Sequence, residues 1–409
     1  MRIVLWHGYL LGGTGSNVYT RALAREWSRL GHEVTVVCQE RSPERYDLGG
    51  ARVVVPELPG RLLPVFVLDA YAGLQPRLIQ ELSDAELDAY VAANAAAVAE
   101  LLPAGLVFAN HVLPGGAVGA RTGSPFVVKA HGSELEYSMR DDARLSQLGA
   151  AALAQADSVY VGSAHIRRVL EDVVGHVERV HEVPPGVDVE AFAPGSREPA
   201  LARLVGEARQ DPSDGDERHP DPGNAERFAR FFASDEPTVL YVGKLIENKG
   251  VQVLLEAMRG VEARTVVVGF GDYRAALEAL APPGTLFTGA LEHRHLVNLL
   301  PLVDVSVVPS IFPEAFGMVA AEAAAAGVPP IVANHSGLAE IADGIAAEYP
   351  PGLAHLTSFQ SGDAAALAAR LEELLALPAE TRSALGVSAR RAVERRWSWT
   401  RVAERLLER

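Results

Sequence analysis

The chain alternates short runs of β-branched, apolar residues with longer stretches whose apolar residues recur at helical spacing. Short strands that are apolar throughout and separated by helices are typical of a parallel sheet covered on both faces. The first half therefore predicts an α/β domain. Its predicted strands are Arg2–Trp6, Glu33–Cys38, Arg52–Leu58, Leu106–His111, Phe126–His131 and Ser158–Gly162, and its predicted helices include Ser16–Leu30 and Asp84–Leu102.

The alternation stops between Pro194 and Pro237, where Pro, Gly and charged residues are frequent and no apolar period is visible. We interpret residues 194–237 as a linker or mobile insertion, with a functional lid as the alternative. A second α/β series follows. Its predicted strands are Thr238–Val242, Ala263–Gly269, Thr285–Gly289, Val305–Val308 and Pro330–Ala333, and its predicted helices include Val251–Met258, Arg274–Ala281, Met318–Ala326 and Ala364–Leu377.

The length of 409 residues fits two domains of ordinary size. We predict two doubly wound, Rossmann-like domains, 1–193 and 238–396, that face each other across a cleft. We also expect the terminal helix 397–409 to pack back on the first domain. Ligands of such sheets bind at the carboxyl ends of the strands, so the loops that follow the strands are the places to search for a site.

Charge and cysteine content restrict the partners. The formal net charge is -15, which argues against a nucleic-acid partner but leaves room for an anionic small molecule in a local basic pocket. The single cysteine, Cys38, excludes a disulfide within the chain. The first apolar run is too short for a signal peptide, and no stretch has the length of a membrane span. We expect a cytoplasmic protein, with peripheral membrane association left open.

Two features of the sequence could bind phosphate. The loop Gly12-Gly-Thr-Gly-Ser-Asn17 joins the first strand to the first helix, where glycines allow a backbone to approach an anion; a tight turn capped by Ser16 or Asn17 explains it equally well. The chain has 37 Lys and Arg but only three lysines. Lys244 and Lys249 follow a predicted strand and are favoured as diphosphate ligands, whereas Lys129 is interpreted as a partly buried strand residue.

Two further motifs supply polar side chains at strand ends. His131 ends a predicted strand and precedes a glycine, which places it at the edge of the sheet. The most informative motif starts at Pro309 and carries Glu314 in a loop and Glu322 in an Ala-rich helix that begins near Gly317. The loop and the helix N-terminus would offer backbone N–H groups to an anion, and carboxylates can accept hydrogen bonds from sugar or ribose hydroxyls.

With these motifs in place, the chain resembles the family-4, glycogen-synthase-like retaining glycosyltransferases of the GT-B fold. The resemblance extends over most of the chain. It rests on the Gly-rich first loop with Asn17-Val-Tyr19, on Val183-Pro-Pro-Gly-Val-Asp188, on Tyr241–Gly250, on Val268-Gly-Phe-Gly271, on Phe287-Thr-Gly289 and, most strongly, on the two glutamates separated by seven residues.

The resemblance implies a role for each matching residue. Glu314 would contact hydroxyls of the donor sugar, Glu322 the donor ribose, and Lys244 and Lys249 the diphosphate, although relatives more often have Arg at position 244. His131 would lie beside the transferred sugar. The backbone of Phe316, Gly317, Met318 and Val319 would bind sugar and phosphate, Gly13 would lie near the diphosphate, and Gly15, Asn17 and Tyr19 would contribute to the acceptor site.

The implied reaction is transfer of a hexose from a nucleotide sugar to an acceptor hydroxyl with retention of configuration, without cofactor or essential metal. UDP is favoured only by its frequency in the family, and GDP and ADP remain open. A small soluble acceptor is favoured over a lipid-linked one. The alternatives are a nucleotide-sugar epimerase or hydrolase of the same fold and a non-catalytic nucleotide-sugar-binding partner. A nicotinamide dehydrogenase is disfavoured because the spaced glycine fingerprint is missing.

Overall fold

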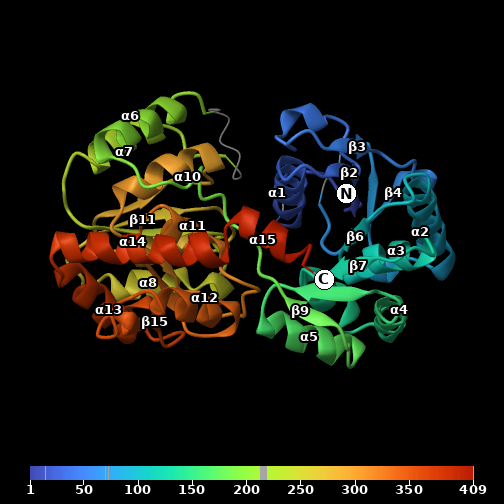
Figure 1. The fold of residues 1–409 in the computed structure, drawn as a ribbon. Helices are drawn as coiled ribbons and strands as arrows, with labels where there is room; N and C mark the ends of the chain where they lie inside the picture. The colour runs from blue at the N-terminus through green and yellow to red at the C-terminus, as the bar shows by residue number, and fades with distance from the viewer. Residues whose placement is uncertain (14, 70, 72, 212–218, 409) are drawn as a thin grey trace. The chain divides into compact units, whose positions relative to one another are not determined.

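The computed structural model describes residues 1–13, 15–69, 71, 73–211 and 219–408. Two compact units divide the chain: unit 1 contains Met1–Gly186 and Val402–Arg409, and unit 2 contains Val187–Arg401. The chain therefore passes from one unit to the other after Gly186 and not after residue 193. Each unit is an α/β fold around a parallel sheet, which confirms the predicted fold class (Figure 1).

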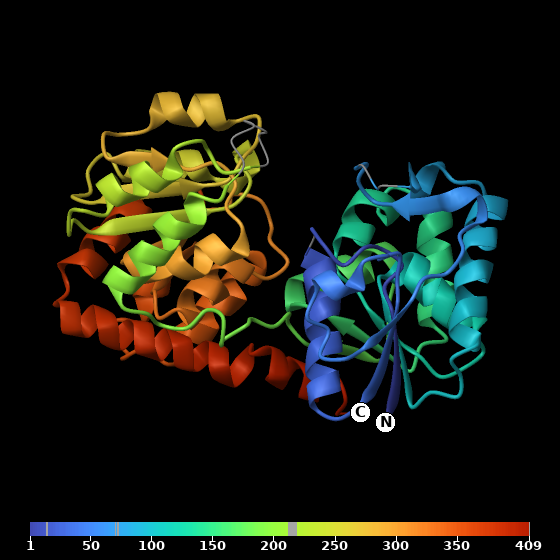
Figure 2. The same ribbon diagram turned by 90° about the horizontal axis from the view of Figure 1, so that it is seen from above.

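Unit 1 has a seven-stranded parallel sheet in the order β3-β2-β1-β6-β7-β8-β9. The central strand pairs with β2 on one side and β6 on the other, with Ile3 aligned to Val34 and to Leu106. Figure 2 shows helices on both sides of these strands. The strands are β1 (Arg2–Trp6), β2 (Glu33–Val37), β3 (Arg52–Val54), β6 (Leu106–Asn110), β7 (Val127–Lys129), β8 (Ser158–Val161) and β9 (Val180–Glu182); β4 (Leu62–Val65) and β5 (Gln75–Leu78) form a separate parallel pair.

The helices of unit 1 follow the predicted periodicity and their caps. The Ser83 side chain accepts the N–H of Glu86, whose own side chain accepts the N–H of Ser83, so a capping box starts α2. Trp27 is fully buried on the inner face of α1. The helices are α1 (Gly15–Arg29), α2 (Asp84–Ala99), α3 (Ala117–Arg121), α4 (Ala143–Leu153) and α5 (Ala164–Val174), with short turns η1 (Pro43–Arg45), η2 (Pro59–Arg61), η3 (Ile79–Glu81), η4 (Val112–Gly116) and η5 (Leu135–Met139).

Unit 2 has a six-stranded parallel sheet in the order β12-β11-β10-β13-β14-β15. Its Ala-rich helix α11 is buried beside β13, β14 and α14, because alanine both favours the helix and allows close packing. The strands are β10 (Thr238–Val242), β11 (Arg264–Val268), β12 (Thr285–Phe287), β13 (Val305–Val308), β14 (Pro330–Ala333) and β15 (Ser358–Phe359). The helices are α6 (Arg197–Ala208), α7 (Asn224–Phe231), α8 (Val251–Ala257), α9 (Arg274–Leu280), α10 (His293–Leu299), α11 (Met318–Ala325), α12 (Ser336–Ala346), α13 (Ala364–Ala376) and α14 (Ala379–Arg396), with turns η6 (Glu247–Lys249), η7 (Leu300–Leu302) and η8 (Ala354–Thr357).

The segment interpreted as a linker forms part of the body of unit 2, and that prediction is wrong for its described residues. Helices α6 and α7 pack together, and their apolar residues Ala200, Leu204 and Phe228 are completely buried in the core of the unit. The Pro- and Gly-rich residues between the two helices favour a linker, although the flanking residues have a helical pattern. Residues 212–218 lie outside the described part of the chain.

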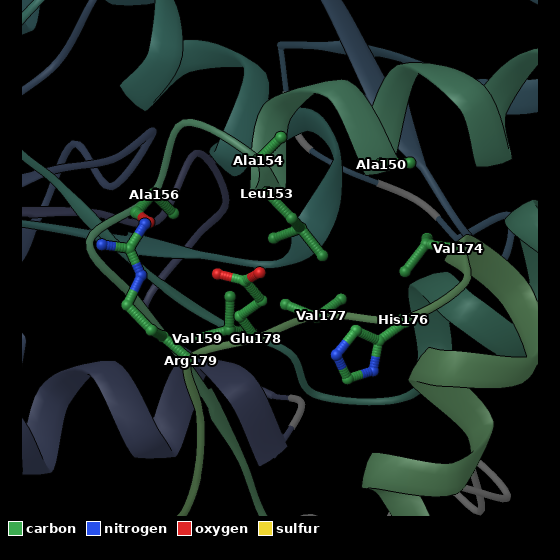
Figure 3. Close-up of a pocket in the computed structure, with 10 residues that line it drawn as sticks. All are labelled: Ala150, Leu153, Ala154, Ala156, Val159, Val174, His176, Val177, Glu178 and Arg179. Carbon is green, nitrogen blue, oxygen red and sulfur yellow. The ribbon is translucent and has the colours of Figure 1, made fainter.

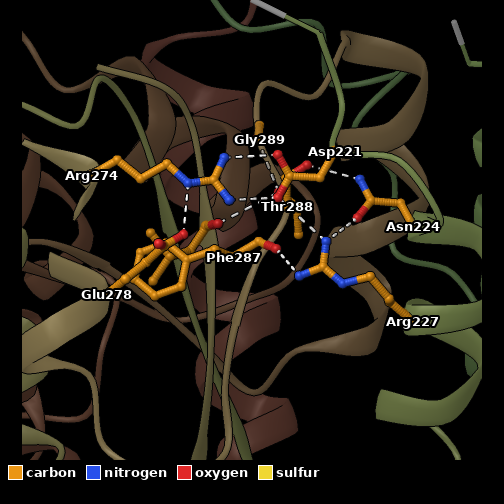
Figure 4. Close-up of polar contacts among 9 residues, drawn as sticks. Asp221, Asn224, Arg227, Arg274, Glu278, Phe287, Thr288 and Gly289 are labelled. Atoms are coloured by element: carbon orange, nitrogen blue, oxygen red, sulfur yellow. Dashed lines mark hydrogen bonds and ion pairs between the residues drawn. The ribbon is translucent and has the colours of Figure 1, made fainter. Parts of the chain in front are cut away.

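Polar contacts attach the start of α7 to the edge of the sheet (Figure 4). Arg274 binds Asp221 through two hydrogen bonds of 2.7 and 2.6 Å, and Arg227 approaches the same carboxylate from another side at 3.3 Å. The Asn224 amide donates to the carbonyl oxygen of Thr288 (2.8 Å). Burial alone would raise the pKa of Asp221, but the two guanidinium groups hold it below its usual value. The paired carboxylate thus fixes this segment beside β12.

The end of the chain is shared between the two units. Trp27 donates its indole N–H to the carbonyl oxygen of Ala403 (3.0 Å), and the Tyr160 hydroxyl donates to that of Leu406 (3.3 Å), so the last turn of α15 (Trp399–Arg405) belongs to unit 1. Trp397 instead packs within unit 2, edge-on against Phe316 with ring centroids 5.6 Å apart. The expectation that all of 397–409 packs on the first domain is thus correct only from Val402 onward.

Candidate active site

Each sheet has a point where the strand order reverses. In unit 1, β1 lies between β2 and β6, and in unit 2, β10 lies between β11 and β13. The loops that leave the carboxyl ends of such neighbouring strands diverge to opposite faces of the sheet and leave a crevice, which is where ligands of this fold class bind. The predicted site residues emerge at these two points, and the two groups are described separately.

In unit 2, the loop after β10 carries both predicted lysines. Lys244 is exposed, and its carbonyl oxygen accepts the Tyr241 hydroxyl at 2.9 Å. Lys249 ends the short turn η6, and Gly250 follows with φ of 69°. A side-chain carbon at Gly250 would lie 1.9 Å from the carbonyl oxygen of Pro309, so only glycine allows the loops after β10 and β13 to approach so closely.

This approach brings the Lys249 ammonium within 2.5 Å of the Glu314 carboxylate. Both side chains are partly exposed, at 32% and 22%, so the pair adds on the order of 1 kcal/mol or less to stability. The Glu314 backbone is held as well, because its N–H donates to the Ser336 hydroxyl (2.9 Å) and its carbonyl oxygen accepts the N–H of Gly337 (3.0 Å). A cation and a carboxylate are therefore positioned together, with faces still open to a ligand.

The N-terminus of α11 lies next in the chain. Gly317 precedes the helix with φ of 120°, and the first bond within the helix runs from the N–H of Ala321 to the carbonyl oxygen of Gly317 (3.2 Å). The N–H groups of Met318, Val319 and Ala320 therefore have no partner within the helix, which favours an anion at this end. Phe316 is buried beneath the loop, so its backbone rather than its ring can serve a ligand.

Glu322 lies one turn further along α11. Its side chain is partly buried, and burial raises the pKa of its carboxyl to about 7. Within the described ranges no hydrogen bond or ion pair reaches this carboxyl group. A partly buried carboxylate without a partner is costly for a protein to keep, and hydroxyl donors from a ligand would remove that cost.

Two residues of this site were missed from the sequence. The His335 ring joins the loops after β13 and β14: its Nε2 lies 2.7 Å from the carbonyl oxygen of Ser310 and its Nδ1 lies 3.0 Å from the Ser336 hydroxyl. Because a carbonyl only accepts, Nε2 carries a proton and donates it to Ser310. Ser336 adopts φ of 50°, a strained value for a residue other than glycine. Both residues come shortly after strand β14.

In unit 1, the predicted His131 follows β7 and is partly exposed. Its Nε2 lies 2.7 Å from Oδ1 of Asn110, which ends β6. Its backbone N–H donates to the Glu134 carboxylate (2.9 Å), which also accepts the N–H of Gly132 (3.1 Å) and lies 3.3 Å from Nδ1 of His111. The Glu134 carboxylate therefore links the loops after β6 and β7.

Two histidines of this cluster, His131 and His7, are held uncharged. Burial lowers the pKa of His131 well below its ordinary value, and His111, Lys129 and His7 lower it further. Burial and then His111 lower the pKa of His7 to about 3. Lys129 is buried as its interpretation required, donates to the carbonyl oxygen of Val183 (2.7 Å), and has a pKa lowered to about 7, mainly by burial.

The predicted site residues of the Gly-rich loop and of the first turns of α1 differ in their exposure to solvent. Gly13 and Gly15 are exposed, and Gly13 has φ of 92°, so their backbone is open to a ligand. Asn17 is buried, its Oδ1 lies 2.8 Å from Nε2 of His7, and its amide donates to the carbonyl oxygen of Gly12. Tyr19 is buried edge-on against His131, with centroids 5.0 Å apart. Asn17 and Tyr19 therefore contact the histidines His7 and His131 from buried positions. Their expected contact with an acceptor stays a prediction.

The apolar segment after β4 reaches the same cluster. The Phe66 ring lies 5.8 Å from that of Tyr9 and 5.0 Å from that of His111, while Val67 and Leu68 are about 60% exposed. This segment brings apolar side chains next to the polar groups at the end of β1 and β6.

A cavity of about 220 Å³ lies elsewhere in unit 1, at the amino ends of β8 and β9 (Figure 3). Alanine and valine make up much of its wall, and Figure 3 shows Arg179 beside Ala156 at one end and His176 at the other. No predicted site residue lines it. Since ligands of doubly wound sheets bind at the opposite, carboxyl ends, this cavity is not the candidate site.

Each half of the chain matches a known family of glycosyltransferases. Residues 13–191 match the family model described as Glycosyltransferase Family 4, and residues 224–392 match the one described as Glycosyl transferases group 1. The chain belongs to the family-4 glycosyltransferases of the GT-B fold.

Several proteins are similar to this glycosyltransferase. A GDP-mannose-dependent monoacylated alpha-(1-6)-phosphatidylinositol monomannoside mannosyltransferase of Corynebacterium glutamicum is 27% identical over 69% of each chain. A D-inositol 3-phosphate glycosyltransferase of Xylanimonas cellulosilytica is 32% identical over 47% of this chain and 44% of the relative, less than half of either. Among solved structures, sucrose-phosphate synthase from Thermosynechococcus elongatus has a TM-score of 0.69 at 22% identity and covers 100% of this chain and 97% of its own, which shows the shared fold.

Two further findings concern this glycosyltransferase. Within the described residues, no group of three or more His, Cys, Asp and Glu side chains could hold a metal ion, and the expectation of metal independence stays a prediction. Across the same residues, no helix combines the length and the apolar character needed to cross a membrane.

Proposed function

We propose that this glycosyltransferase moves a hexose from a nucleoside-diphosphate sugar to an acceptor hydroxyl with retention of configuration. The observation that carries the proposal is the position of Lys249 and Glu314, 2.5 Å apart at the switch point of unit 2 and next in sequence to the open N-terminus of α11. Cation, carboxylate and unpaired N–H groups match the diphosphate and the sugar hydroxyls of such a donor.

In this proposal each group acts on a different part of the donor. Lys244, Lys249 and the backbone N–H groups at Gly317–Val319 bind the diphosphate and stabilise the charge that grows on it as the bond to the sugar breaks. Glu314 accepts hydrogen bonds from sugar hydroxyls. Glu322 accepts them from the ribose, which supplies the donors that its carboxyl group lacks in the unliganded chain.

The proposed chemical step breaks the bond between the anomeric carbon and the phosphate oxygen and forms a bond from the same face to the acceptor oxygen. The acceptor proton passes to the departing phosphate, so charges and atoms balance without a protein base. The sugar passes through an oxocarbenium-like state. Glu314 is a positioning group rather than a nucleophile in this scheme, as the resemblance to the family implies.

The acceptor and the nucleotide are proposed from the relatives. One relative is named for GDP-mannose and a phosphatidylinositol mannoside, and another for inositol 3-phosphate. Both acceptor names contain an inositol ring, so we propose a polyol hydroxyl as the acceptor. GDP-mannose becomes the first donor to test, ahead of the UDP-sugar that family frequency favoured.

A transfer assay tests the proposal. The full chain is incubated with GDP-mannose, UDP-glucose or ADP-glucose, each with myo-inositol, inositol 3-phosphate or phosphatidylinositol vesicles. We expect a mass increase of one hexose on one acceptor class and, by NMR, the donor's anomeric configuration in the product. Free sugar in place of a conjugate would indicate a hydrolase, an inverted anomer would contradict retention, and an unchanged donor with every acceptor would contradict transfer from these donors.

A further inference from the structure

The hydrogen bond between His131 and Asn110 fixes where the imidazole proton lies. The Asn110 amide nitrogen faces the carbonyl oxygen of Trp6 (3.3 Å) and the hydroxyl of Thr20 (3.4 Å). A carbonyl oxygen only accepts, and the Thr20 hydroxyl already donates to the carbonyl oxygen of Ser16 (2.8 Å). Both partners therefore require a donor from Asn110, and its NH₂ group must point toward them.

The other end of the amide determines the state of the histidine. Oδ1 of Asn110 is an acceptor and lies 2.7 Å from Nε2 of His131, so Nε2 must carry a proton. In a neutral imidazole the remaining nitrogen, Nδ1, then has a free lone pair. Among the described residues no hydrogen-bond partner occupies Nδ1, and His131 is partly exposed. The ring therefore presents an acceptor, not a donor, to whatever binds there.

Burial and, after it, the neighbouring basic groups keep His131 neutral. His111 lies beside it at a ring distance of 4.6 Å, Lys129 lies on its own strand, and His7 faces it from the end of β1. The Glu134 carboxylate is the one nearby group of opposite sign among the described residues, but its oxygens bind backbone N–H groups and His111. Tyr19 packs edge-on from α1. Burial first, and then His111, Lys129 and His7, lower the pKa of His131, as expected for a ring held uncharged.

A second asparagine–histidine pair in the same unit has the same arrangement. The Asn17 amide donates to the carbonyl oxygen of Gly12, so its Oδ1 faces Nε2 of His7 at 2.8 Å. Nε2 of His7 is therefore also protonated, and its Nδ1 is buried without a partner in the described part of the chain. In both pairs an asparagine whose amide nitrogen donates to a backbone carbonyl turns its oxygen toward Nε2 of the histidine.

We propose that Asn110 is a positioning residue that holds His131 as the neutral Nε2–H tautomer, so that Nδ1 accepts a hydrogen bond from a substrate hydroxyl. The role in turnover rests on the proposed glycosyl transfer, whereas the tautomer does not. An acceptor-only nitrogen selects a neutral hydroxyl and disfavours a phosphate or carboxylate oxygen at this point.

Nitrogen-15 NMR of the full chain with labelled histidine tests the tautomer directly. The His131 signals are assigned by their loss in His131→Gln. We expect one N–H nitrogen, Nε2, and one bare nitrogen, Nδ1, throughout pH 6–8. In Asn110→Asp the new carboxylate should raise the pKa of His131, so that both nitrogens carry protons near neutral pH. A proton on Nδ1 in the wild type, or a charged ring, overturns the proposal.

Kinetics then test the role. We expect Asn110→Asp to lower kcat about tenfold or more at pH 7, with recovery as pH rises and the ring loses its extra proton. Asn94→Asp is the matched control, because Asn94 is also a buried asparagine of unit 1 but pairs with Trp6 Nε1 (3.1 Å) rather than with a histidine. It should leave the His131 spectrum and the shape of the pH profile unchanged.

The outcomes separate the two proposals. A doubly protonated His131 in Asn110→Asp with an unchanged pH profile contradicts the positioning role. If the wild-type spectrum is as expected but no donor is turned over, the fault lies in the proposed transfer reaction and not in the assignment of the tautomer, which the wild-type spectrum alone supports.

Discussion

The unpartnered carboxyl group of Glu322 leads to a prediction in which stability and ligand binding change in opposite directions. The side chain is partly buried within α11, and burial raises its pKa from 4.5 to about 7. If this group is kept for the donor ribose, the unliganded protein bears the cost of its charge. Glu322→Gln removes the charge and conserves the size of the side chain.

The magnitude follows from the shift in pKa. The folded value exceeds the unfolded one by roughly 2.5 units, which corresponds to about 3 kcal/mol. The folded state is not penalised below about pH 4.5. It loses stability as pH rises from 4.5 to about 7, because the unfolded chain then releases a proton that the buried carboxyl group retains, and the penalty is complete above pH 7. The variant stays neutral. It should therefore match the wild type near pH 4.5 and exceed it by up to about 3 kcal/mol at pH 8.

The affinity for the donor should decrease in Glu322→Gln, whereas the stability increases. A carboxylate that accepts ribose hydroxyls contributes about 1.5–3 kcal/mol, so Glu322→Gln should weaken donor binding roughly 10–100-fold at pH 8. Wild-type affinity should itself fall as pH drops through 7. Urea unfolding at pH 5 and 8, and calorimetric titration of the donor at the same pH values, measure both effects.

Glu372→Gln is the matched control, because Glu372 is an exposed glutamate on α13 of the same unit. It should change neither stability nor affinity. The reasoning is refuted if Glu322→Gln is less stable than the wild type at pH 8, or if it binds the donor as tightly.

Two further predictions concern buried charge. The stability of the wild type should rise as pH increases from about 7 toward 10, because the buried Lys129, with a pKa lowered to about 7, binds fewer protons in this range than it does in the unfolded chain. Lys129→Met should remove this pH dependence of stability. Parallel urea midpoints at pH 7, 8 and 9 in wild type and variant would contradict this. Arg274→Leu breaks the paired contact with Asp221 and should lower the free energy of unfolding by about 1–2 kcal/mol, because Asp221 keeps only Arg227. Arg259, an exposed arginine of the same unit, gives the control Arg259→Leu, and equal urea midpoints for the two variants would contradict the prediction.

Much of the fold could be predicted because buried parallel strands leave a local signature. The bounds of β1, β10, β13 and β14 match the predicted runs, since each strand is apolar and followed by a turn. Strands β9 and β15 were missed because they have only three and two residues. The parallel pairing of β4 with β5 was not predicted, and each of these strands contains a proline, which is unusual within a sheet.

The candidate site was predictable only in part. Lys249 and Glu314 could be suspected because each follows a strand, and the fold brings them together. The state of His131 could not be derived from the sequence. It depends on Asn110 and on the carbonyl oxygen of Trp6, which is far away in sequence and adjacent only because β1 pairs with β6. Local patterns therefore identify candidate residues, and tertiary pairing determines their chemistry.

The central claim is that the edge between β10 and β13 binds the diphosphate of a nucleotide sugar, and calorimetric titration tests it most directly. GDP, UDP and ADP are titrated against the wild type, Lys249→Ala and the control Arg259→Ala. We predict that one nucleotide binds the wild type and the control alike and binds Lys249→Ala at least tenfold more weakly, with the difference shrinking at high salt. Equal affinity in Lys249→Ala, or no binding of any nucleotide to the wild type, would contradict the account.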